Sequence, residues 1–190
     1  FKIRVTPEKD ARTITVSDNG IGMTKEELDS NLGVIARSGS LKFKDGLGEN
    51  AQEDAAIDII GQFGVGFYSA FMVASKVTVV SRAEGSEEAW QWSSSGVEGY
   101  TLTEAEKPEV GTEITLVLKE DTETDKYSEY LDEYTISGLV KKYSDYIRYP
   151  ITMYREKSRQ KPKPEDAGDD YKPEYETYTE LETPVSYTHL

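Results

Sequence analysis

Two runs near the start of the chain, FKIRVTP and RTITVSD, alternate apolar and polar residues. The apolar positions of this alternation are Ile3, Val5, Ile14 and Val16. Because successive side chains of a strand point to opposite faces, each run predicts a strand with one buried face. The residues PEKDA between the runs favour a turn. The sequence therefore predicts an antiparallel hairpin, one face of which the rest of the chain must cover.

Later segments mix strand and helix patterns. The runs KVTVVSR, EAWQWSS and TEITLVLK indicate three more strands. Thr24, with Glu27 three residues later, matches a capping box and predicts the start of a helix. An apolar helical run covers 67–74, and another helix begins near residue 134, with an apolar stripe made of Ile136, Leu139, Val140, Tyr143 and Ile147. This order of elements indicates an α+β fold.

The charge and composition of the chain limit its chemistry. The net charge is −14, which disfavours binding to nucleic acid or to an anionic membrane. No apolar run approaches the roughly 18 residues of a membrane-spanning helix. The chain has no cysteine, so disulfides and thiolate sites are excluded, and we expect a cytoplasmic protein. Its one histidine, His189, lies next to the end, so we expect no serine–histidine triad.

The two ends of the sequence carry expectations of their own. The chain begins with Phe1 inside a strand pattern, which we interpret as a fragment that is incomplete at its N-terminus. From 155 to 182 charged residues, Pro and Tyr dominate, a composition typical of a linker or a disordered segment. The final PVSYTHL reads as translated vector sequence. We therefore expect a nucleotide-binding domain at 1–154, a charged linker at 155–183 and a non-native tail at 184–190.

The stretch TVSDNGIGM places a carboxylate at the end of a strand and follows it with two glycines. The alternation of the strand points Asp18 toward the buried face, where a carboxylate costs several kcal/mol unless it gains a partner. A flat ligand with an N–H donor is one such partner. Gly20 and Gly22 would let it approach the backbone, and Met23 would offer a polarizable wall. A tight turn capped by Asp18 explains the same residues.

Two further segments contain glycines in suggestive places. GQFGVGF opens a predicted helix, and its backbone N–H groups suit an anion, although a plain glycine-rich turn is the alternative. It lacks the Gly-Lys-Ser/Thr of a P-loop and reverses the glycine order of a dinucleotide fingerprint. In PEVGTEITL, Thr112 either contacts a ligand beside Asp18 or simply begins a strand. The polar residues 38–56 have the length of a functional lid.

Taken together, these segments occur in the order of the motifs of the GHKL ATPases, which include gyrases, heat-shock chaperones, histidine kinases and MutL-type repair proteins. The stretches DNGIGMTKEELDSNLGVIARSGS, IGQFGVGFYSAFMVASKVTVVSR and VKKYSDYIRYPI closely resemble the heat-shock protein 90 family in its bacterial form. The resemblance covers about 1–183. It implies a two-layer α/β sandwich with a mixed, largely antiparallel sheet and helices on one face.

The resemblance also implies nucleotide-binding residues. Asp18 would accept a hydrogen bond from the adenine amino group, and Thr112 would support Asp18 and a structural water. The segment 33–40 would begin a lid over bound ATP. The other implied contacts are Gly22 and Met23 at the adenine, Asn31 near the ribose and phosphates, Arg37 at the phosphates where many members carry lysine, and Gly61, Gly64, Val65, Gly66 and Phe67 in the phosphate-side loop.

The function that the resemblance implies is that of an ATP-dependent chaperone in the stress response. Members bind ATP or ADP with Mg²⁺, hold unfolded client proteins and act as homodimers. In that family the catalytic glutamate and the magnesium-binding asparagine lie on an upstream helix, and the catalytic arginine lies in a middle domain. Neither part is in this sequence. We therefore expect no catalytic residue and no metal ligand in it, and little ATPase activity from these residues alone.

Three other functions are compatible with parts of the sequence. A DNA-repair or topoisomerase ATPase of the same superfamily is disfavoured by the charge of −14. A sensor histidine kinase does not suit the long polar segment and the strands after it. A non-enzymatic interaction module would show no nucleotide affinity. Trp90 and Trp92 alternate on one strand face, and we expect them to pack rather than to bind a ligand.

Overall fold

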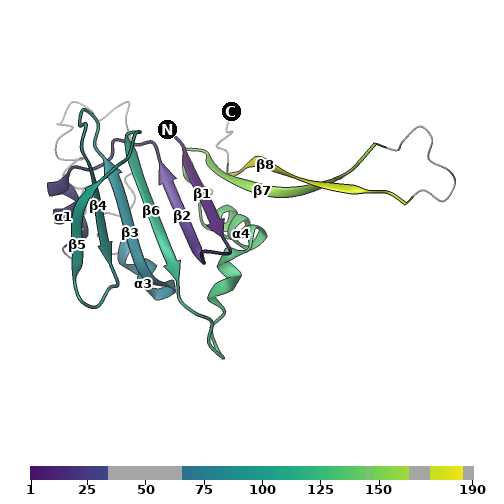
Figure 1. Cartoon of the computed structure of the whole chain (residues 1–190), viewed down its shortest axis with the longest axis horizontal. Coiled ribbons are helices and arrows are strands. Elements are labelled where there is room, and N and C mark those ends of the chain that lie inside the picture. Colours follow the sequence, from purple (N-terminus) through teal and green to yellow (C-terminus); the bar gives the residue numbers. More distant parts are fainter. Residues whose placement is uncertain (34–65, 145, 163–171, 186–190) are drawn as a thin grey trace.

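A computed structural model describes residues 1–33, 66–144, 146–162 and 172–185. Its framework is one eight-stranded sheet with the strand order β5-β4-β3-β6-β2-β1-β7-β8 (Figure 1). The strands are β1 Ile3–Glu8, β2 Thr13–Asp18, β3 Ala74–Arg82, β4 Ala89–Ser94, β5 Tyr100–Ala105, β6 Gly111–Leu118, β7 Ile151–Gln160 and β8 Tyr175–Val185. Neighbours pair antiparallel except β1 and β7, which are parallel. The α+β class and the mixed, largely antiparallel sheet are confirmed.

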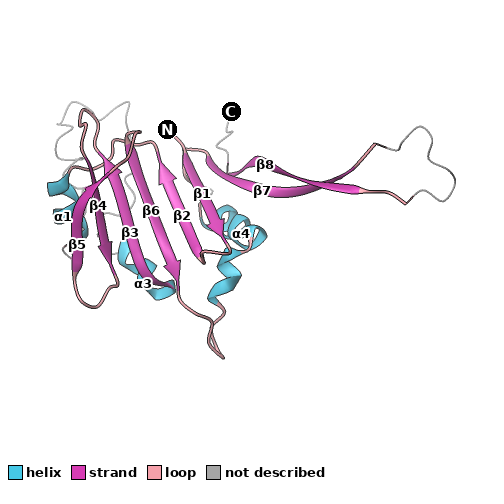
Figure 2. Ribbon diagram, viewed as in Figure 1, coloured by secondary structure: helices cyan, strands magenta, loops and turns pink. Residues whose placement is uncertain are grey.

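The helices pack against one face of this sheet, on its far side in the view of Figure 2. They are α1 Lys25–Leu32, η2 Phe67–Ser69, α3 Ala70–Val73, η3 Tyr127–Leu131 and α4 Glu133–Tyr143. The predicted capping box opens α1, since Thr24 accepts from the Glu27 N–H and the Glu27 carboxylate accepts from the Thr24 N–H. No helix among the described residues is long and apolar enough to cross a membrane.

The core lies between the helices and the apolar face that the strand alternation predicts. Val5 pairs with Val16 across β1 and β2, which confirms the predicted hairpin and its single apolar face. One half of the core packs Ile136 of α4 against β1, β2, β6 and β7. The other half packs Leu28 of α1 against β3 and β4. The apolar stripe predicted for α4 is wrong at Tyr143, which is 59% exposed at the end of the helix.

The interpretation of 155–182 as a disordered segment is wrong for its described residues. They form an antiparallel ladder between β7 and β8 that extends away from the rest of the sheet (Figure 1). The base of β7 belongs to the core, where Met153 is fully buried. Beyond it, basic residues of β7 face acidic residues of β8 in the ion pairs Arg155–Glu182, Lys157–Glu180, Lys157–Glu182 and Arg159–Glu176. Lys161 and Glu174, just past the ends of the two strands, form one more pair.

Composition misled here because it records how many charges a segment has and not how they alternate. Opposite charges on facing strands form cross-strand pairs, which is a strand pattern rather than a disorder pattern. The pairing of β7 with β8 begins at Ile151 and Val185, so it crosses the boundaries predicted at 154/155 and 183/184. The division into a domain, a linker and a tail remains a prediction.

The N-terminal cap of α4 gives the fold a pH dependence. The Asp132 carboxylate accepts hydrogen bonds from the N–H and the hydroxyl of Thr135, at 2.8 and 3.0 Å. Because these bonds, the backbone one first, favour the charged form, they hold the pKa of Asp132 below its usual value of 3.8. A carboxyl group with a lowered folded pKa stabilises the fold above its unfolded pKa. That stability is lost as the pH falls through the folded pKa.

Asp132→Ala should therefore lower the melting temperature at neutral pH, because it removes the cap. The difference from the wild type should shrink as the pH falls below about 3.8 and on through the lower folded pKa, because the folded wild-type carboxylate then becomes protonated as well. Thermal unfolding followed by circular dichroism over a pH series measures both effects. Asp10→Ala is the control, because the Asp10 carboxylate accepts no hydrogen bond from a described residue. An equal loss at neutral and acidic pH would contradict the role of Asp132.

Candidate functional site

Three polar side chains form a row across the strands at the end of β2. Asp18, the last residue of β2, pairs with Thr112 of β6, and Thr112 pairs with Ser81 of β3. All three continue the apolar side of their strands, so they share the face that carries the helices. Thr112 and Ser81 are buried and Asp18 is half-buried. The structure thus brings together Asp18 and Thr112, which lie 94 positions apart (112 − 18) in the sequence.

One oxygen of the Asp18 carboxylate fixes the turn after β2. Oδ1 accepts a hydrogen bond of 2.8 Å from the N–H of Gly20. Among the described residues no donor is bonded to Oδ2. The two interpretations of Asp18 are therefore compatible, because one oxygen holds the turn while the other is able to accept from a ligand.

The turn between β2 and α1 is seated on the end of β3. Gly22 has a left-handed φ of +66°, and a Cβ added to it would lie 1.9 Å from the carbonyl oxygen of Arg82. On either side of Gly22, the Ile21 carbonyl accepts from the N–H of Glu84 at 2.7 Å, and the Met23 N–H donates to the Ser81 hydroxyl at 2.8 Å. Only glycine permits this approach. The absence of a Cβ at Gly22 therefore lets the turn approach β3.

The glycine of the Gly-Thr motif has a similar steric role. Gly111 has a φ of +123°, and a Cβ on it would lie 2.2 Å from the carbonyl oxygen of Asp18. Its lack of a side chain therefore lets the start of β6 lie against the end of β2. This approach places Thr112 directly beside Asp18.

An apolar cluster adjoins the polar row. Met23 and Phe67 both pack on the core cluster that contains Leu28 and Trp92. Phe67 meets Trp92 edge to face with 5.5 Å between ring centroids. The structure therefore brings Met23 and Phe67 to one cluster. Trp92 is buried in it and Trp90 packs against it, so the expectation that both tryptophans pack is confirmed.

The remaining predicted site residues fall into two groups. Asn31 is half-buried on α1, and Gly66 precedes η2 with an ordinary φ of −59° and an exposed backbone. Neither Asn31 nor Gly66 makes a hydrogen bond to Asp18 or to Thr112. Arg37, Gly61, Gly64, Val65 and the greater part of the predicted lid lie outside the described residues.

Ser81 is the residue that the sequence analysis missed. Ser81 is completely buried. Its hydroxyl lies 2.9 Å from that of Thr112 and 2.8 Å from the Met23 nitrogen. A signal was present in the sequence, because Val77 and Val79 continue to Ser81 with a period of two. A polar residue at the next apolar position of a strand needs a hydrogen-bond partner.

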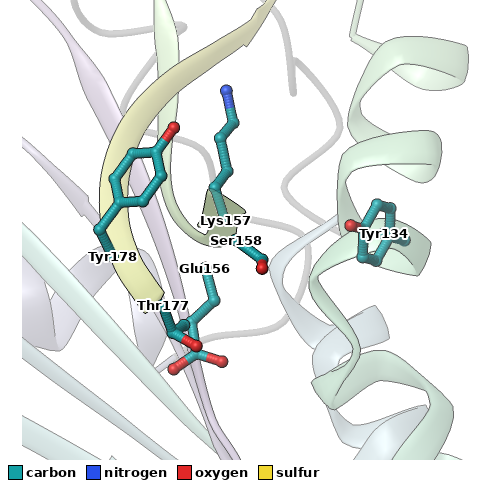
Figure 3. Close-up of a pocket in the computed structure, with 6 residues that line it drawn as sticks. All are labelled: Tyr134, Glu156, Lys157, Ser158, Thr177 and Tyr178. Atoms are coloured by element: carbon teal, nitrogen blue, oxygen red, sulfur yellow. The ribbon is translucent and has the colours of Figure 1, made fainter. Parts of the chain in front are cut away.

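A cavity of about 400 Å³ lies elsewhere, between α4 and the β7–β8 ladder (Figure 3). Its lining residues are Tyr134, Glu156, Lys157, Ser158, Thr177 and Tyr178. None is a predicted site residue. The one ammonium group in its lining, that of Lys157, is paired with Glu180 and Glu182 at 2.8 Å each. Since that charge is already neutralised, the cavity does not favour a phosphate, and the row at Asp18 remains the candidate site.

Comparison with known families places this row in an ATPase domain. The model of the histidine kinase-, DNA gyrase B- and HSP90-like ATPases matches residues 1–124, and the model of the Hsp90 protein matches residues 129–185. Every described candidate residue lies within the first match.

Bacterial chaperone proteins named HtpG are close relatives. That of Clostridium acetobutylicum is 56% identical over 161 residues, which are 85% of this chain and 25% of the relative. That of Clostridium perfringens is 53% identical over 190 residues, 100% of this chain and 29% of the relative. That of Bacillus subtilis is 60% identical over 153 residues, 80% of this chain and 24% of the relative. The chain thus spans between 24% and 29% of the length of these relatives.

The seating of the turn is testable with a pair of glycines. Gly22 and Gly85 both have left-handed φ angles, +66° and +77°, but a Cβ on Gly85 would meet nothing within 4 Å. Gly85→Ala therefore measures backbone strain alone, about 1–2 kcal/mol. Gly22→Ala adds the clash with Arg82 and should lower the free energy of unfolding further. Urea unfolding of both variants gives the comparison, and equal losses would show that the turn does not rest on β3.

Proposed function

The chain belongs to the Hsp90 family within the histidine kinase-, DNA gyrase B- and HSP90-like ATPases, and on this premise we propose that it binds adenine nucleotides at the end of β2. The observation that carries the proposal is the row of Asp18, Thr112 and Ser81 beside the seated turn. A half-buried carboxylate with one oxygen fixed by Gly20 is an acceptor of defined direction. The exocyclic amino group of adenine is a matching donor.

The neighbouring residues suit the rest of a nucleotide. Met23 and Phe67 offer polarizable and aromatic surface for the base. The proposed contacts also include Gly22 and Asn31, and toward the phosphates Gly61, Gly64, Val65, Gly66 and Arg37. We propose that ATP and ADP bind with Mg²⁺, which would neutralise phosphate charge when bound. No group of three or more metal-ligating side chains occurs within the described ranges, so no residue of this set is proposed as a magnesium ligand.

We propose that these residues bind the nucleotide and that hydrolysis depends on others. Asp18 is the only carboxylate among the proposed contacts, and its role at the base separates it from the phosphates. The proposed set therefore contains no group to activate water. ATP hydrolysis is an activity of the ATPase family to which the chain belongs, and little of it is expected from these 190 residues by themselves.

At the level of the whole protein we propose an ATP-dependent chaperone. The relatives are named chaperone proteins and are much longer than this chain. Binding of unfolded client proteins, a homodimer, a role in the stress response and a cytoplasmic location belong to this proposal. A gyrase-like or repair ATPase is disfavoured by the net charge of −14 and by the Hsp90 match over 129–185.

Calorimetric titration of the chain with ADP and Mg²⁺, with circular dichroism recorded alongside, tests the nucleotide site. Asp18→Asn should weaken binding by about 1.5–3 kcal/mol, the range for a hydrogen bond to a charged group, because the amide cannot replace the charge. This corresponds to roughly 10- to 150-fold in affinity. Asp10→Asn, in the turn between β1 and β2, is the matched control and should bind as the wild type does. Unchanged ADP affinity of Asp18→Asn would remove Asp18 from the base-reading role.

A further inference from the structure

The Ser81 hydroxyl joins the two parts of the candidate site. It accepts a hydrogen bond of 2.8 Å from the N–H of Met23, in the turn after β2. It lies 2.9 Å from the hydroxyl of Thr112 and 3.2 Å from the carbonyl oxygen of Gly111, both at the start of β6. No part of Ser81 is exposed to solvent. A buried hydroxyl with partners from two motifs sets the geometry of both.

Counting protons assigns a direction to these bonds. A serine hydroxyl has one proton to donate and two lone pairs, and the Met23 N–H already occupies one lone pair. The proton goes either to Thr112 at 2.9 Å or to the Gly111 carbonyl at 3.2 Å. Oxygen-to-oxygen hydrogen bonds fall at about 2.5–3.0 Å, so Thr112 is the better acceptor. When Ser81 donates to Thr112, the proton of Thr112 is released for an acceptor on its other side.

We propose that Ser81 is a positioning residue that keeps the Thr112 hydroxyl a donor next to the Asp18 acceptor, and thereby selects adenine over 6-oxopurines. This inference rests on the proposed nucleotide site. Adenine presents an amino donor beside a ring-nitrogen acceptor, which complements an acceptor at Asp18 and a donor at Thr112. A 6-oxopurine presents a carbonyl acceptor beside an N–H donor, the opposite order. A mismatch of this kind leaves polar groups unpaired, which disfavours binding.

A purely structural serine would behave differently. If Ser81 only tied the turn to β3, its loss would loosen the site for every nucleotide alike. If Ser81 directs the Thr112 proton, the loss of Ser81 weakens the binding of ADP. The binding of inosine diphosphate, the nucleotide of a 6-oxopurine, is then hardly affected. The ratio of the two affinities therefore separates positioning of a proton from support of the fold.

The experiment measures the dissociation constants of ADP and inosine diphosphate for the 190-residue chain and its variants, with a melting curve for each. Ser81→Ala should lose about 10-fold in ADP affinity and less than about 2-fold for inosine diphosphate. Ser81→Thr keeps the hydroxyl and should keep the preference for ADP over inosine diphosphate. Ser81→Cys keeps the volume with a weaker donor, and it serves if the alanine variant unfolds. Ser93→Ala is the matched control, because Ser93 is also buried but bonds to Thr78 on the opposite face.

The outcomes are distinct for the two proposals. Equal weakening of both nucleotides, or no weakening by Ser81→Ala or Ser81→Cys, overturns the inference about Ser81. If Asp18→Asn still weakens the binding of ADP in that case, the proposed nucleotide site stands. If the folded wild-type chain does not bind ADP, the proposed nucleotide site falls and the inference falls with it.

Discussion

The site depends on the contact between the turn after β2 and the end of β3. Gly22 rests on the Arg82 carbonyl at a distance that excludes any side chain, and hydrogen bonds from Glu84 and to Ser81 hold the turn on either side. With the turn in place, Gly20 fixes one oxygen of Asp18. The direction of the carboxylate therefore comes from backbone packing rather than from a charged partner, which suits the proposed recognition of a neutral base.

The hydrophobic core and the candidate site lie on the same face of the sheet. The apolar positions of its strands carry α1 and α4, and those of β2 and β3 end in Asp18 and Ser81. The site thus begins where the hydrophobic core stops, so the packing that makes the fold also orients the polar row. The hairpin of β7 and β8 extends from one edge of the sheet, with its charges paired across the strands (Figure 1).

Local sequence patterns correctly predicted the features that depend on residues near each other in the chain. The alternation of Ile14 and Val16 gave the face of β2 and the orientation of Asp18, and the capping box gave the start of α1. Composition failed at 155–182, because a ladder of opposite charges resembles disorder unless the partner strand is known. Strand β5 was not predicted, since it lies at an edge and alternates only weakly. Ser81 was missed because its role arises from contacts with residues 58 and 31 positions away.

The most direct test of the account is a map of backbone amide chemical shifts as ADP is added to the chain. The account predicts the largest changes at Asp18 to Met23 and at Gly111 and Thr112, with a clear response of the Ser81 amide. Residues of the cavity between α4 and the hairpin, such as Tyr134 and Tyr178, should not respond (Figure 3). Changes centred on that cavity, with none at Asp18 or Thr112, would contradict the central claim that the end of β2 reads the adenine base.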